Sequence, residues 1–136
     1  MKRANKNGFA LVEILLATLI IVIAGVAILQ TFLLGAHFSL VNKDRTIAMT
    51  HLGSMMETVI STPFNSIVAK FPDGVADGPG SNLYTNIVGG YTLKNEHLTV
   101  SYVNPSSDPL EITVALSWQD AQGLTQVNYL STKKTK

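Results

Sequence analysis

The sequence contains no cysteine among its 136 residues, so it has neither a disulfide framework nor a thiolate for catalysis or metal binding. Charged residues are also scarce, at 14% of the chain, whereas hydrophobic residues make up 46%. The net charge of only +1 gives no reason to expect a nucleic-acid partner. A chain of this length suffices for one small domain and one membrane-spanning helix, but not for two hydrophobic cores.

The sequence lacks a nucleophile constellation, a glycine-rich phosphate loop and a catalytic pair of carboxylates, so we expect a protein that is not an enzyme and that uses no cofactor. The three histidines, His37, His51 and His97, do not have the spacing of metal ligands. Asp73 and Asp77 stand in a glycine-rich stretch that does not fit a calcium-binding EF loop, so we interpret them as turn-forming residues. No metal site is expected.

Formal charge is almost absent from one long segment near the N-terminus. Between Phe9 and Leu34 the only charged residue is Glu13, and the segment exceeds the roughly 20 apolar residues that cross a bilayer. Three basic residues and no acidic residue precede this segment, whereas both signs of charge follow it. The positive-inside rule therefore predicts a single-pass protein with a cytoplasmic N-terminus and an exported C-terminal part.

Glu13 lies one turn into this apolar segment, where an ionised carboxylate is costly unless it has a partner. One interpretation is that the side chain reaches the cytoplasmic interface and has no partner. The other interpretation is that a second chain supplies the partner.

A single long helix is the simplest interpretation of the first 62 residues. No proline occurs before Pro63, so we expect a continuous helix over residues 9–62, about 80 Å long at 1.5 Å per residue. Residues 9–34 would form the transmembrane half. In the second half, apolar residues recur at helical spacing: Val41, Ala48, Leu52, Met55, Met56, Val59 and Ile60. We expect this stripe to cover a sheet.

The remaining sequence predicts a loop followed by strands. Residues 63–90 are rich in glycine and proline, which indicates a variable loop. Apolar and polar residues then alternate in two segments, with Leu98, Val100 and Tyr102 on one face of the first, and Ile112, Val114, Leu116 and Trp118 on one face of the second. With "LTQVNYL" as a third strand and "GYTL" as a short edge strand, residues 91–136 predict an antiparallel meander of three to four strands. The fold class is α+β.

The C-terminus carries three lysines, Lys133, Lys134 and Lys136. We interpret them as part of a frayed tail rather than as a patch that binds DNA or an anionic surface.

The N-terminal residues carry a family resemblance. Lys6, Gly8, Phe9 and Glu13 belong to the pattern K-x-G-F-x-L-V-E, followed by an uncharged helix. This resembles the N-terminus of type IV prepilins, the superfamily of type IV pilins, minor pilins and type II secretion pseudopilins. Ordinary signal peptides have neither a glutamate within the apolar run nor a basic leader that ends at Gly-Phe.

The resemblance implies that a prepilin peptidase removes the basic leader, residues 1–8, by cleavage between Gly8 and Phe9, and that Phe9 is then N-methylated. It also implies that Glu13 pairs, in a filament, with the α-amine of Phe9 on a neighbouring subunit. The implied partners are other pilin or pseudopilin subunits, the peptidase and methyltransferase, an inner-membrane assembly platform and, before assembly, membrane lipid. The implied location is the bacterial inner membrane, and then a pilus or pseudopilus.

Some features indicate which members of the superfamily the chain is most similar to. The segments "SWQDAQG" and "VNYLST" are similar to those of small minor pilins of the modification type and of minor pseudopilins. Ala10 stands where threonine or serine is commoner in the family, the apolar helix lacks the proline of many major pilins, and there is no C-terminal cysteine pair. These departures favour a minor subunit, and Glu13 argues against the tip pseudopilins that lack this glutamate.

Two alternatives belong to another functional class. A secreted protein would be cleaved after a small-residue site such as residues 25–27, but residues 28–34 remain apolar beyond that cut. A binding or adhesion protein would keep the helix as an uncleaved anchor. Within the superfamily, the alternative to a minor pilin is a minor pseudopilin of type II secretion.

Overall fold

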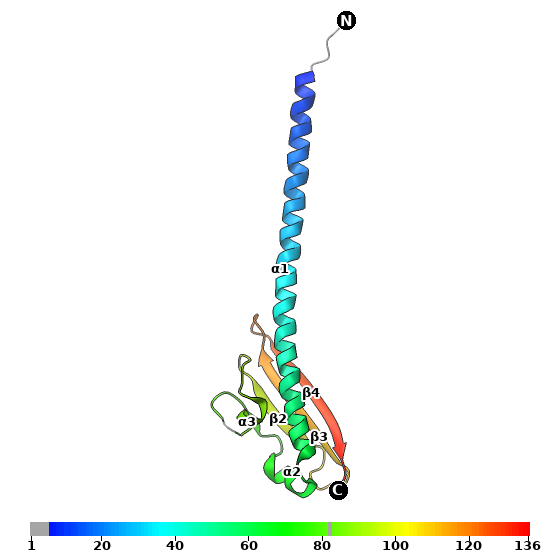
Figure 1. Cartoon of the computed structure of the whole chain (residues 1–136), viewed down its shortest axis with the longest axis vertical. Helices are drawn as coiled ribbons and strands as arrows, with labels where there is room; N and C mark the ends of the chain where they lie inside the picture. Colours follow the sequence, from blue (N-terminus) through cyan, green and yellow to red (C-terminus); the bar gives the residue numbers. More distant parts are fainter. Residues whose placement is uncertain (1–5, 82) are drawn as a thin grey trace. The chain divides into compact units, whose positions relative to one another are not determined.

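The structure is a computed structural model that describes residues 6–81 and 83–136 (Figure 1). The chain divides into two compact units, one up to Leu40 and the other from Val41 to the C-terminus. The elements in chain order are α1 (Lys6–Ser61), α2 (Phe64–Lys70), β1 (Ala76–Asp77), α3 (Thr85–Val88), β2 (His97–Tyr102), β3 (Leu110–Gln119) and β4 (Thr125–Lys134). The α+β class and the antiparallel meander predicted from the sequence are confirmed.

The helix α1 begins at Lys6 and ends at Ser61, which confirms the predicted continuous helix. Two residues later Pro63 ends it, because a proline lacks the N–H group that the next helical hydrogen bond requires and its ring clashes with the preceding turn. The last turn is closed by the N–H group of Thr62, which donates to the carbonyl oxygen of Thr58 at 3.1 Å.

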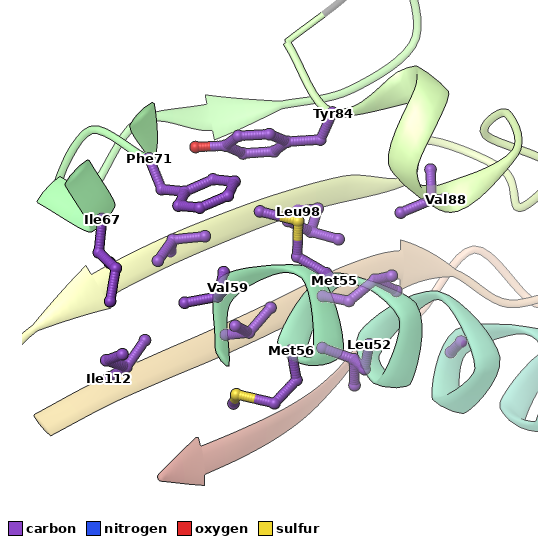
Figure 2. Packing of buried hydrophobic residues seen from close by; sticks show 14 of the residues in the cluster. Leu52, Met55, Met56, Val59, Ile67, Phe71, Tyr84, Val88, Leu98 and Ile112 are labelled. Atoms are coloured by element: carbon purple, nitrogen blue, oxygen red, sulfur yellow. The ribbon is translucent and has the colours of Figure 1, made fainter. Parts of the chain in front are cut away.

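The second half of α1 packs against the sheet through its apolar stripe (Figure 2). The buried residues of this stripe are Ala48, Leu52, Met55, Met56 and Val59. Val41 and Ile60 were predicted to belong to the stripe, but they are 38% and 45% exposed, so the prediction is wrong at both ends. Val41 lies two turns before the first buried position, and Ile60 lies at the margin of the arc that faces the sheet.

The four strands form one antiparallel sheet in the order β1-β2-β3-β4. The ladder between β2 and β3 runs from the pair His97↔Ser117 to the pair Tyr102↔Ile112, and the ladder between β3 and β4 joins ten residue pairs without interruption. The alternation predicted for β2 and β3 is confirmed, because the following residues are buried on one face: Leu98, Val100, Tyr102, Ile112, Val114, Leu116 and Trp118. No residue of β4 is fully buried.

The segment between α1 and β2 has more regular structure than the predicted loop over residues 63–90. It contains α2, β1 and α3, and its side chains Ile67, Phe71 and Tyr84 complete the core. The prediction of an edge strand at residues 90–93 is wrong. The edge strand that pairs with β2 is β1. The reason lies in the backbone: the N–H groups at positions 92 and 93 bond to a carboxylate, that of Glu96, instead of to a strand.

The prediction that the three C-terminal lysines belong to a frayed tail is wrong for Lys133 and Lys134, because β4 extends to Lys134. The Nζ atom of Lys134 donates to the carbonyl oxygen of Thr62 at 2.5 Å and to that of Ile60. A lysine in this position satisfies carbonyl groups that the end of a helix leaves without partners. Lys133 pairs with Glu111 of β3.

We expect that Met55→Ala will lower the free energy of unfolding of the globular unit by about 2–5 kcal/mol, because it leaves a cavity against the sheet. Met49→Ala makes the same chemical change in the same helix at a position that is 43% exposed, and Met55 is fully buried. The measurement is urea unfolding of the full chain in detergent, followed by fluorescence of Trp118, its only tryptophan. Equal losses in the two variants would contradict the packing described here.

Candidate functional site

Large apolar side chains are exposed along the first half of α1. Those that are more than half exposed are Leu11, Val12, Ile14, Leu15, Leu16, Leu19, Ile20, Ile21, Val22, Ile23, Ile28, Leu29, Phe32, Leu33 and Leu34. The most apolar 18-residue window of the helix has a mean hydropathy of 2.8, and none of it is buried. A helix of this length and composition near the N-terminus is compatible with a membrane anchor or with a signal sequence.

This apolar surface surrounds the helix rather than forming one stripe. Ile20, Ile21, Val22 and Ile23 are consecutive and all exposed, and successive residues of an α-helix point about 100° apart. A monomeric soluble protein rarely exposes an apolar patch of more than a few hundred Å². An apolar surface on all sides of a helix is compatible with a membrane anchor or a signal sequence, and one groove on one partner would cover only a single side of it.

Two hydroxyl groups within this apolar half are satisfied by the helix itself. The hydroxyl of Thr18 donates to the carbonyl oxygen of Leu15, and that of Thr31 donates to the carbonyl oxygen of Ala27, both at 2.9 Å. Such bonds let a threonine face hydrocarbon without an unpaired donor. The two hydroxyls therefore do not require polar partners outside the helix.

Glu13 differs from these threonines, because its side chain is exposed on α1 without such a bond. Among residues 10–81 and 83–136, whose side chains the structure describes, no basic side chain forms an ion pair with Glu13, whereas Glu111 has such a partner in Lys133. A carboxylate in apolar surroundings is costly unless it is paired or reaches water. The partner predicted for Glu13, at the membrane interface or on another chain, therefore stays a prediction.

The two residues of the predicted processing site, Gly8 and Phe9, fall within the first turn of α1. Residues 1–5 and the side chains of residues 6–9 lie outside what the structure describes. Cleavage between Gly8 and Phe9 and methylation of Phe9 therefore stay predictions.

A buried hydrogen-bonded pair joins α1 to the segment before β2. Glu96 is fully buried, and its Oε1 atom lies 2.5 Å from Nδ1 of His51. Its Oε2 atom accepts the backbone N–H groups of Thr92 and Leu93 at 3.0 and 2.9 Å. No sequence pattern predicts this pair, because the two residues are 45 positions apart.

A second buried carboxylate, that of Asp77, organises the loop between β1 and α3. It accepts the backbone N–H groups of Leu83 at 3.3 Å and Tyr84 at 2.7 Å, as well as the hydroxyl of Tyr91. Burial by itself raises the pKa of this carboxyl, but the hydrogen bonds from Ser81, Tyr91 and the backbone outweigh it and lower the pKa below its usual value. Asp77 itself is a residue of β1, and its carboxylate bonds to residues of the following loop, whereas Asp73 accepts the N–H group of Tyr102. The two aspartates thus order the loop through distant hydrogen bonds rather than through local turns.

Three tyrosines next to this loop act as structural donors or packing residues. Burial, together with the charge of Asp77, raises the pKa of Tyr84 to about 12. Burial also raises the pKa values of Tyr91 and Tyr102. The hydroxyl of Tyr102 donates to the carbonyl oxygen of Phe71 at 2.8 Å. These groups stay protonated at neutral pH and hold the segment from α2 to β2 on the sheet.

Comparison of the chain with protein-family models, curated proteins and solved structures returned no match. The architecture itself is pilin-like: a long N-terminal helix, apolar in its first half, packs through its second half on a four-stranded antiparallel sheet. The class of fold thus agrees with the resemblance of the N-terminal residues.

We expect Asp77→Asn to reduce the free energy of unfolding at pH 7 by about 1–3 kcal/mol, because an amide nitrogen would face the N–H donors of the loop. The folded pKa of Asp77 is lowered, so its contribution is present above the unfolded value of about 3.9 and is lost as the pH falls through the folded pKa.

The stability gap between wild type and Asp77→Asn should therefore narrow between pH 5 and pH 2, as measured by urea unfolding at a series of pH values. Asp108→Asn, in an exposed loop, is the matched control. A gap that stays constant over this range would refute the role given to the carboxylate.

Proposed function

We propose that this protein is a minor structural subunit of a type IV pilus-like filament, cleaved between Gly8 and Phe9 and assembled through the apolar half of α1. The observation that carries the proposal is Glu13, the one charge in a helix segment that is apolar and exposed on all sides. A helix that only anchors the chain in lipid needs no such charge. In a filament, however, an ion pair with a neighbouring chain would favour one register between the packed helices.

Cleavage would create the partner of Glu13. The new α-amine of Phe9 is a positive charge at the end of an apolar helix, and Glu13 lies four residues, about one helical turn, further along. When subunits pack with a stagger of this order, the amine of one chain meets the carboxylate of the next. Removing one member of a buried ion pair costs about 3–5 kcal/mol, so packing in other registers is disfavoured.

In this proposal the apolar half of α1 has two successive environments. Before assembly it lies in the inner membrane, with the N-terminus cytoplasmic and the globular unit exported. After assembly, helices of neighbouring pilin or pseudopilin subunits replace lipid around it. The prepilin peptidase and an inner-membrane assembly platform are the partners at these two stages, and a minor pseudopilin of type II secretion would use the same chemistry.

The test is the distribution of Glu13→Leu and Glu13→Gln between membranes and sheared filaments, quantified by immunoblot. We expect normal membrane insertion and a loss of filament incorporation of at least about tenfold, because the α-amine of the neighbour is left unpaired. Thr18→Val is the matched control, since it also removes a polar group from the apolar half, but one already satisfied within the helix.

Full incorporation of Glu13→Leu would overturn the proposal. Stronger membrane retention of this variant, with no other change, would instead favour the uncleaved anchor of a binding or adhesion protein.

A further inference from the structure

The strand β4 forms one edge of the sheet. It has β3 on one side and, in the part of the chain that the structure describes, no strand on the other. It is ten residues long, and its residues alternate between exposed and half-buried, whereas every second residue of β3 is buried. Figure 1 shows β4 at the border of the sheet, beyond β3. A long edge strand presents unpaired backbone groups to any other chain.

The backbone hydrogen bonds near β3 define which residues of β4 face outward. The N–H group of Val103 donates to the carbonyl oxygen of Glu111, and that of Gln119 donates to Lys94, so odd-numbered residues of β3 face β2. The N–H group of Asp120 donates to Leu124, so even-numbered residues face β4. Backbone groups alternate in direction along a strand. The odd residues of β4 therefore direct N–H and C=O away from the sheet: Thr125, Val127, Tyr129, Ser131 and Lys133.

The opposite edge of the sheet is closed. The strand β1 has two residues, which is too short to accept another strand. Beyond it, the N–H group of Gly74 donates to the carbonyl oxygen of Val100 at 2.9 Å, and the carboxylate of Asp73 accepts the N–H group of Tyr102 at 3.0 Å. The two edges of the sheet thus differ, because the edge at β1 has little room for another strand and the edge at β4 is unpaired.

The edge of β4 lacks the usual protections against strand pairing. From Thr125 to Thr132 it contains no charge, proline or glycine, and its one-to-one register with β3 contains no bulge. Lysines often protect such edges, but Lys133 pairs with Glu111 and Lys134 bonds to the end of α1. The edge is open over eight consecutive residues.

Two apolar side chains accompany the open edge. Val127 and Tyr129 are 57% and 70% exposed, and both lie on the sheet face opposite α1. Their partners on the neighbouring strand β3 are the small residues Ser117 and Ala115. An added strand would find apolar neighbours for its own alternate side chains here, in addition to backbone partners.

The direction of β4 argues against a second copy of this chain as the partner. Lys134, at the end of β4, contacts the end of α1, while Gln126, near its start, lines one small cavity with Asp44 and Arg45 of α1. The two elements therefore run in the same direction. Antiparallel pairing of two β4 strands would therefore place the Val41 ends of the two globular units at opposite ends of the pair. In the proposed function both of these ends connect to segments in the same membrane, so this pairing does not fit.

Parallel pairing of two β4 strands would place the helices of the two globular units on opposite faces of the joined sheet. This pairing does not fit the proposed assembly, because there the helices of neighbouring subunits pack together. Pairing of β4 with the other edge of a second copy has no long strand available, because that edge is closed. The partner that fits is a segment of a different chain.

We propose that the open edge of β4 takes up an extended, uncharged segment of a different subunit of the same filament, as a fifth strand of this sheet. This inference rests on the proposed function, because the partner subunit is encountered during assembly. The segment would alternate apolar and polar residues, with its apolar side chains beside Val127 and Tyr129, and its backbone would bond to the odd residues of β4.

The test is amide hydrogen exchange of the full chain, resolved to single residues, in detergent and in sheared filaments. We expect exchange at Val127, Tyr129 and Ser131 to slow by at least about tenfold in filaments, because their N–H groups gain acceptors. Asn128 and Leu130 are internal controls, since their N–H groups already face β3 and should be protected in both states.

A variant adds an independent readout. Tyr129→Pro removes an outward N–H group at an edge, where proline is tolerated, so the ladder to β3 is kept and the added strand loses a donor. We expect its protection at Ser131 in filaments to fall to the level in detergent. Thr135→Pro, one residue beyond β4, should behave like wild type. Trp118 fluorescence verifies that both variants are folded.

Each outcome has a distinct meaning. Unchanged exchange at the odd residues, in filaments that contain the chain, would overturn the added strand and leave the proposed function standing. Absence of the chain from filaments would overturn both. Protection that already appears in detergent and rises with protein concentration would show pairing with a second copy, and would overturn a different subunit as the partner.

Discussion

The structure depends on how the apolar first half of α1 is covered. Its side chains are exposed all around the helix, and a single groove would cover only one side of them. Lipid covers such a surface without requiring any charge, so in the proposed function Glu13 is the residue that would distinguish an assembly element from an anchor. Glycine is not required by close contacts at Gly25 or Gly35, since a Cβ atom there would meet nothing within 4 Å in this chain.

The globular unit is stabilised by a core between the second half of α1 and the sheet, and by two buried carboxylates. Glu96 joins α1 to the segment before β2, and Asp77 holds the loop before α3. A buried carboxylate that accepts several N–H groups is favourable only when all its partners are in place, so these residues specify one loop conformation. The result is a rigid sheet with one closed edge and one open edge.

The long elements were predictable because burial imposes a period on them. The stripe around Met55 and the alternation along β2 and β3 follow from local sequence, as does the stop at Pro63. The edge strand β1 and the ordered loop were not predictable, because they depend on carboxylate bonds between residues far apart in the chain. The roles of Gly8 and Phe9 in cleavage and of Glu13 in assembly rest on the resemblance alone and stay predictions, and the structure adds the exposure of the helix around Glu13. The open edge of β4 depends on strand order, which no local pattern contains.

In the proposed function, cleavage between Gly8 and Phe9 creates the partner of Glu13, and the whole assembly depends on this step. It is tested most directly by mass spectrometry of the N-terminus of the protein purified from its native membrane, with Gly8→Ala measured alongside wild type. Our account predicts a wild-type chain that begins at N-methylated Phe9 and a variant that keeps residues 1–8. A wild-type chain that begins at Met1, or near Ile28, would contradict it.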